Sequence, residues 1–144
     1  MKKILLTLFT IIFLNIGGVP AINFVYAQEQ PASKVFAYYF HGSSRCPGCY
    51  RLEKYSKEAI ETCFKDALAA GKLEFKAINV EDKGNQYYAD YYQLYTKTLI
   101  LSLERNGKEV KWKNLNEIWK YIDDKQGFID YVQGEVVDYL KEAQ

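Results

Sequence analysis

Residues 35–49 read Val-Phe-Ala-Tyr-Tyr-Phe-His-Gly-Ser-Ser-Arg-Cys-Pro-Gly-Cys, and this stretch decides the fold. Residues 35–40 are apolar or aromatic and carry no charge, which predicts a buried central strand. A short loop follows, and Pro47 suits the first turn of a helix, where its missing N–H costs nothing. Apolar residues then recur at helical spacing over 52–68, and Gly71 ends the pattern. The stretch therefore predicts a buried strand that leads through a loop into a long amphipathic helix.

Two cysteines, Cys46 and Cys49, lie at the start of that helix. Because only two residues separate them, they can open and close a disulfide without moving the rest of the chain. The unpaired N–H groups of a helix N-terminus stabilise a thiolate, and the neighbouring Arg45 adds a positive charge. We therefore expect Cys46, at the exposed helix start, to attack a disulfide, and Cys49, one turn further in, to resolve the mixed disulfide. A permanently closed structural disulfide is the alternative.

The rest of the chain predicts further alternating elements. They are a strand over 73–80, a tyrosine-dense helix over 85–95, a strand over 98–103, an antiparallel strand over 109–112 and a helix that starts at 115–122 and continues over 129–140. Asn106-Gly107 is the hairpin pattern between the last two strands. The order β-α-β-α-β-β-α predicts an α/β domain with a central mixed sheet of about four strands flanked by helices.

This arrangement resembles the thioredoxin fold in its size, its element order, its cysteine pair at the first helix and its hairpin after the third strand. The string Tyr38-Tyr39-Phe40-His41-Gly42, then Arg45-Cys46-Pro47-Gly48-Cys49, then Leu52-Glu53 is also similar to a narrower subgroup, the exported thioredoxin-like proteins labelled as nitrophenyl-compound nitroreductase subunits of the ArsF type. The resemblance implies a thiol–disulfide oxidoreductase that needs no cofactor besides its own redox-active disulfide. Its partners would be protein thiols and disulfides and a membrane electron donor.

The chain departs from the family at several positions. Pro47-Gly48 inverts the Gly-Pro order of thioredoxin proper, so the sequence leaves open whether partners are reduced or oxidised. Thioredoxins carry a cis-proline before the third strand, whereas Lys97 or Thr98 takes that place here. The usual buried acid of the first strand is missing too. Glu53 lies one helical turn after the second cysteine and is a candidate proton acceptor, with a solvated surface glutamate as the alternative.

These departures keep two other classes of function open. His41, Cys46 and Cys49 could bind a soft metal such as Cu(I), as in an exported copper carrier, although a structural histidine is an equal alternative. A non-catalytic redox-partner subunit could instead keep the fold as a scaffold.

Two further features have structural and functional interpretations. Cys63 lies about 21 Å along a straight helix from Cys49, too far for a disulfide, and falls on the apolar stripe as an inert core thiol. The tyrosines of 87–95 cannot all fit one narrow stripe. They favour a wide amphipathic helix with aromatic packing, and a docking surface for a partner protein is the alternative.

The N-terminus has the pattern of an export signal. A basic start is followed by an apolar run over 4–14 and by Val25-Tyr26-Ala27, which predicts a cleaved signal over 1–27, a flexible lead-in over 28–33 and one domain over 34–144. We expect an exported monomer in a periplasmic or other extracytoplasmic space, without stable membrane insertion after cleavage. An uncleaved anchor is the alternative. The net charge of +1 gives no basic face for nucleic acid.

Overall fold

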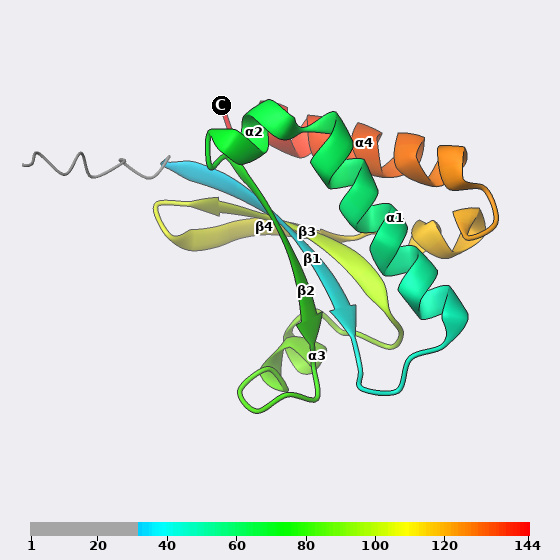
Figure 1. Ribbon diagram of the computed structural model, residues 1–144. Helices are drawn as coiled ribbons and strands as arrows, with labels where there is room; N and C mark the ends of the chain where they lie inside the picture. The colour runs from blue at the N-terminus through cyan, green and yellow to red at the C-terminus, as the bar shows by residue number, and fades with distance from the viewer. Residues whose placement is uncertain (1–31) are drawn as a thin grey trace, which may run out of the picture.

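The computed structural model describes residues 32–144, so the expected signal over 1–27 and most of the lead-in lie outside the described residues. The elements follow the predicted order, with two short helices added (Figure 1). They are β1 (Ser33–His41), α1 (Pro47–Cys63), α2 (Lys65–Ala69), β2 (Leu73–Asn79), α3 (Tyr87–Tyr91), β3 (Thr98–Arg105), β4 (Lys108–Asn114), the 3₁₀ helix η1 (Asn116–Tyr121) and α4 (Lys125–Glu142). No helix among these is long and apolar enough to cross a bilayer.

The predicted mixed sheet is confirmed, with the strand order β2-β1-β3-β4. β1 runs parallel to β2 and antiparallel to β3, and β4 returns antiparallel to β3. The β3–β4 turn is made by Asn106 and Gly107, whose φ angles of 53° and 74° are those that the sequence pattern predicts for a tight hairpin. The central position of β1 explains why its sequence carries no charge between Val35 and Phe40.

Alternate residues of β1 serve two separate cores on the two faces of the sheet. Val35, Ala37 and Tyr39 join the larger core under α1 and α4, whereas Phe36 and Phe40 belong to the smaller core under α3. Figure 1 shows the two long helices on one face and α3 on the other. Because successive side chains of a strand point to opposite faces, one apolar run supplies both cores.

The long predicted helix is interrupted, which corrects the expectation of one helix up to Gly71. At Phe64 the backbone has φ −129° and ψ 34°, and the side chain stays in the core at 8% exposure. The apolar period continues through this point, so periodicity alone did not indicate the break. Gly71 itself has φ 69°, in agreement with its predicted role as a stop.

The tyrosine-dense helix is also shorter than predicted and covers Tyr87–Tyr91 instead of 85–95. Gln93 ends it with a left-handed φ of 52°, a conformation that the sequence pattern gave no reason to expect at glutamine. The C-terminal helical region is divided as well. Asp124 lies between η1 and α4, and its side chain accepts a hydrogen bond from the Gly127 N–H and caps α4.

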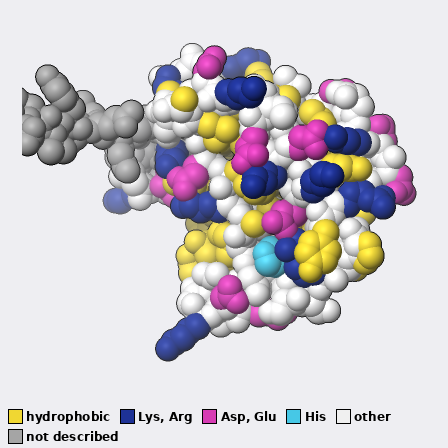
Figure 2. Space-filling view, viewed as in Figure 1, with side chains coloured by type: hydrophobic (Ala, Val, Ile, Leu, Met, Phe, Trp, Pro, Cys, Tyr) yellow, Lys and Arg dark blue, Asp and Glu magenta, His cyan; other side chains and the backbone are white. Residues whose placement is uncertain are grey.

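Oppositely charged side chains are interspersed on the face shown in Figure 2. Ion pairs in the described part of the chain include Lys34–Glu74 at 2.5 Å and Lys113–Glu135 at 2.7 Å. The single histidine, in cyan in Figure 2, is His41. It is the last residue of β1 and therefore lies at the end of the sheet from which the chain leads into α1.

Candidate functional site: a disulfide at the start of α1

Cys46 and Cys49 form a disulfide, with their Cα atoms 5.1 Å apart. Cys46 is the N-cap of α1, in extended conformation, and Pro47 occupies the first helical turn as predicted. The sulfur of each cysteine also accepts a hydrogen bond from the backbone N–H of the other. The Cys49 N–H donates to Cys46 Sγ at 3.2 Å, and the Cys46 N–H donates to Cys49 Sγ at 3.3 Å. The sulfurs thus accept hydrogen bonds from backbone N–H groups at the helix start, and such groups stabilise a thiolate when the bond opens.

The two cysteines differ in their accessibility. Cys46 is exposed, whereas Cys49 is only 1% exposed and belongs to the buried residues of α1. Below Cys49, the buried hydroxyl of Tyr39 donates a hydrogen bond of 2.6 Å to the Cys49 carbonyl. Burial raises the Tyr39 pKa to about 12, so this hydroxyl stays protonated as a donor. Only one sulfur of the pair is therefore accessible to a large molecule.

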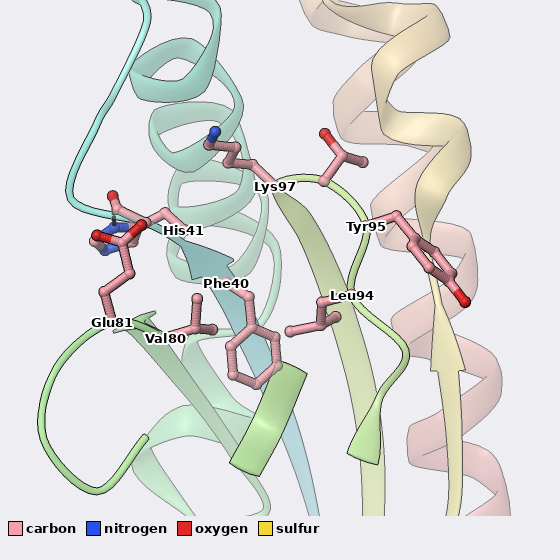
Figure 3. A pocket seen from close by; sticks show the side chains of 9 residues that line it. Phe40, His41, Val80, Glu81, Leu94, Tyr95 and Lys97 are labelled. Atoms are coloured by element: carbon pink, nitrogen blue, oxygen red, sulfur yellow. Dashed lines mark hydrogen bonds between the residues drawn. The ribbon is translucent and has the colours of Figure 1, made fainter. Parts of the chain in front are cut away.

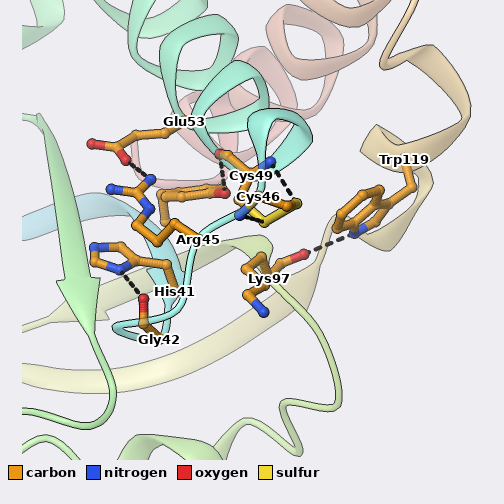
Figure 4. The surroundings of a disulfide bond; sticks show 9 residues. His41, Gly42, Arg45, Cys46, Cys49, Glu53, Lys97 and Trp119 are labelled. Atoms are coloured by element: carbon orange, nitrogen blue, oxygen red, sulfur yellow. Dashed lines mark hydrogen bonds and ion pairs between the residues drawn. A yellow bond between two sulfur atoms is a disulfide. The ribbon is translucent and has the colours of Figure 1, made fainter.

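Arg45 and Glu53 form an ion pair beside the disulfide (Figure 4). Their side chains are 14% and 26% exposed, and the Arg45 guanidinium also stacks over the Tyr50 ring, 4.2 Å from its centroid. Burial opposes the charge of Arg45, but the Glu53 carboxylate outweighs it and raises the pKa of the guanidinium. Glu53 is therefore a partly buried, ion-paired carboxylate and not a solvated surface glutamate, and it neutralises the positive charge that the sequence places beside the thiolate.

The loop between β1 and α1 is tied to the end of β2. The Ser43 N–H donates to Glu81 at 3.1 Å, and the Asn79 amide donates to the Ser43 hydroxyl at 3.0 Å. A Cβ at Gly42 would lie 2.5 Å from a Glu81 carboxylate oxygen, so a side chain at this position would displace the Glu81 carboxylate. These contacts fix the approach of the chain to the cysteine pair.

The proposed three-ligand metal set of His41, Cys46 and Cys49 is not assembled. His41 Nδ1 lies 3.0 Å from the carbonyl oxygen of the adjacent Gly42, and within residues 32–144 no three His, Cys, Asp or Glu side chains are placed to hold a metal ion. Thr98 is also engaged elsewhere, since its buried hydroxyl donates to Asn114 at 2.5 Å.

Lys97 is the residue before β3 that lies near the disulfide, as Figure 4 shows. Its carbonyl accepts a 2.8 Å hydrogen bond from the indole N–H of Trp119, a residue of η1. An added Cβ at Gly48 would lie 3.9 Å from Trp119 and 3.0 Å from Ile122. Neither side chain was expected at the site, although a glycine between the two cysteines is a sequence feature that fits such a close approach.

A cavity of about 160 Å³ opens at the ends of β1 and β2 (Figure 3). Phe40, His41, Glu81 and Lys97 are among the residues that line it, and neither cysteine of the disulfide does. Hydrogen bonds from Ser43 lower the Glu81 pKa, with smaller contributions from Lys97 and His41. The cavity therefore adjoins the loop of the site but does not contain the sulfur atoms.

Cys63 is free and half-buried at the far end of α1, which confirms that it does not pair with the other two cysteines. The tyrosines of 87–95 divide into two groups. Tyr88 and Tyr92 pack against β1, as the packing interpretation predicts, whereas three are exposed: Tyr87 (57%), Tyr91 (53%) and Tyr95 (95%).

No protein-family model and no curated protein sequence matches the chain. Among solved structures, it is similar to a thioredoxin of Fasciola hepatica, with 14% identity over 77% of this chain and 82% of that one and a TM-score of 0.43. It is also similar to Trxlp of Edwardsiella tarda, with 18% identity over 73% and 85% and a TM-score of 0.38, and to thioredoxin f2 of Chlamydomonas reinhardtii, with 17% identity over 69% and 82% and a TM-score of 0.35. The strand order of the sheet and the helices on its two faces give the chain a thioredoxin-like α/β fold with a Cys-x-x-Cys disulfide at the start of α1.

Proposed function

We propose that the protein is a thiol–disulfide oxidoreductase that exchanges disulfides with partner proteins through Cys46 and Cys49. The observation that supports this most strongly is the asymmetry of the pair. Cys46 is exposed at the helix N-cap, and Cys49 is buried one turn away. A structural disulfide needs no such difference, whereas an exchange reaction needs one sulfur that meets the partner and one that is protected from it.

The reaction follows from this geometry. In the reduced protein, the Cys46 thiolate attacks one sulfur of a partner disulfide, the partner S–S bond breaks, and the released partner thiolate takes up a proton. The Cys49 thiol then loses its proton and attacks Cys46 Sγ, which closes the intramolecular disulfide and releases the second partner thiolate. The second partner thiolate also takes up a proton. Counted from the dithiol form, in which Cys46 gives up its proton before the attack, the protein loses two electrons and two protons, and the partner gains two of each. The reverse sequence oxidises a dithiol partner.

The proposal extends to the setting of the protein. We propose that it is exported and acts as a monomer on protein thiols in an extracytoplasmic space, with a membrane electron donor as the source of electrons if it reduces its partners. The ArsF-type subgroup is the finer relationship proposed from the string around the cysteines. The chain's own disulfide is then the only redox centre that the reaction needs.

The test is an equilibrium titration of the cysteine pair in defined thiol buffers, read by trapping of free thiols. We expect a reversible two-electron transition, with a potential near about −270 mV for a reductant or about −120 mV for an oxidant. Cys46→Ser should abolish reduction of protein disulfides, and Cys63→Ala should not. A pair that does not titrate, or does so only after chelation, contradicts the proposal and would instead favour a structural or copper-binding role.

A further inference from the structure

The two sides of the disulfide have different chemistry. One side holds the Arg45–Glu53 ion pair, and the opposite side holds Trp119 from η1 (Figure 4). Ile122, which directly follows η1, lies beside Trp119 against Gly48. We call Trp119 and Ile122 the apolar wall. A molecule that reaches the Cys46 sulfur therefore meets charged groups on one side and apolar groups on the other.

The apolar wall lies within reach of the attacking sulfur. The Cβ position at Gly48 is 3.8 Å from Cys46 Sγ, 3.9 Å from the Trp119 ring and 3.0 Å from the end of the Ile122 side chain. Both wall residues are only half-buried, so part of each side chain stays accessible. An extended polypeptide advances about 3.3 Å per residue. A segment whose cysteine meets Cys46 can thus place a side chain on the wall from a position one or two residues away.

The wall is also held in place by contacts with the rest of the domain. The Trp119 indole N–H donates to the Lys97 carbonyl at 2.8 Å, and the neighbouring Ile118 is fully buried. Arg51 of α1 pairs with Asp123 at 2.6 Å, and its guanidinium also lies 3.4 Å from the Ile122 carbonyl. Arg51 and Asp123 therefore neutralise each other beside Ile122, and these contacts preorganise the apolar surface for a ligand.

We propose that the apolar wall is a specificity subsite, which selects partner disulfides with a large apolar or aromatic side chain within two residues of the attacked cysteine. The inference rests on the proposed exchange reaction, because that reaction brings a cysteine-bearing segment to Cys46. An aromatic side chain on a half-buried tryptophan and isoleucine gains both apolar burial and ring packing. A small or charged side chain at that place gains neither.

The test uses two synthetic peptide disulfides of equal net charge. Each is a homodimer of a short peptide with one cysteine, which carries phenylalanine on both sides in one peptide and glycine on both sides in the other. The reduced protein is mixed with each peptide, and the loss of protein thiols gives the second-order rate constant. We expect the phenylalanine peptide to react about 5- to 10-fold faster. Equal rates with the wild-type protein overturn the proposal.

Variants of the apolar wall test whether its residues cause the preference for the phenylalanine peptide. Trp119→Ala and Ile122→Ala should each lower the ratio to about twofold or less, with little change for the glycine peptide. Trp119→Phe keeps an aromatic ring without the N–H, so it should retain most of the preference. Trp112 is the matched control, because it is the other tryptophan, lies on β4 and is 36% exposed. Trp112→Ala should leave the ratio unchanged.

The outcomes separate the two proposals. A preference that survives both Trp119→Ala and Ile122→Ala overturns the subsite but leaves the exchange reaction in place. If the reduced protein oxidises with neither peptide, the proposed function fails and the subsite fails with it.

Discussion

The Arg45–Glu53 ion pair should couple the loop before the cysteines to the first turns of α1. We consider Glu53→Gln, which removes the negative charge at nearly constant shape, Arg45→Met, which removes the positive charge and keeps an unbranched apolar side chain, and the double variant. Each single variant leaves one charge without its partner in a place where water reaches it only in part. The double variant removes both charges, so no unpaired charge is left at the site.

The exposure of the pair sets the magnitude of its contribution. At 14% and 26% exposure, the side chains lie between surface ion pairs, which contribute about 0–1 kcal/mol, and fully buried ones, whose breakage costs about 3–5 kcal/mol. We therefore expect each single variant to lower the free energy of unfolding by about 1–2 kcal/mol. Arg45→Met also loses the stacking over Tyr50. The expected coupling energy of the double-mutant cycle is about 1 kcal/mol.

The assay is urea unfolding of the oxidised protein, followed by far-ultraviolet circular dichroism, for the wild type and the three variants. A coupling energy below about 0.3 kcal/mol would be additive within error and would refute the structural role of the pair. A second readout is the alkylation rate of reduced Cys46. Glu53→Gln frees a positive charge near the thiolate and should raise this rate about threefold, and Arg45→Met should lower it.

Three further predictions concern the surroundings of the disulfide. Burial raises the Tyr39 pKa from 10.0 to about 12, so this residue contributes stability that is complete below pH 10 and is lost as the pH rises through 12. Urea unfolding at pH 9 and pH 11.5 measures this loss, and Tyr39→Phe should make the fall in unfolding free energy between the two pH values smaller by about 2 kcal/mol. At pH 7 the same variant should cost about 1 kcal/mol, because it loses the hydrogen bond to the Cys49 carbonyl. Gly48→Ala should change the unfolding free energy by less than about 0.5 kcal/mol, because the higher helix propensity of alanine offsets the crowding of its Cβ against Ile122. Adding Ile122→Val to this variant removes the crowded methyl group and should raise the unfolding free energy. A further loss of stability in the double variant would disprove the crowding. Cys63→Ala should leave the reduction potential unchanged, and a shift above about 10 mV would show that the free thiol communicates with the pair.

Local sequence patterns predicted the parts of this fold that local physics determines. The uncharged run of β1, the Asn106-Gly107 hairpin and the position of Pro47 in α1 each follow from one short segment and its backbone preferences. The break at Phe64 could not be predicted in this way. The apolar spacing continues through Phe64 without a signal. The feature that goes with its changed backbone angles is the packing of its side chain in the core, which depends on the tertiary structure.

The candidate site likewise contains features that short sequence segments predict and features that depend on the tertiary structure. The cysteine pair was evident from its spacing, and Glu53 was identified by its helical face. Its partner Arg45 was assigned to the thiolate instead, because the sequence does not show which way a loop side chain turns. Trp119 is separated from the pair by three strands, so its arrival beside Gly48 depends on the whole sheet topology.

This long-range contact also explains the order of the two residues between the cysteines. Pro47 fits the first turn of α1, where no N–H is required. The next position faces Ile122, and even a single Cβ there would come within 3.0 Å of the isoleucine side chain. A proline at position 48, as in the Gly-Pro order of thioredoxin proper, would add a whole ring to this contact. The Pro-Gly order is therefore the one that lets the apolar wall approach the disulfide, and the dipeptide and the wall form one structural feature.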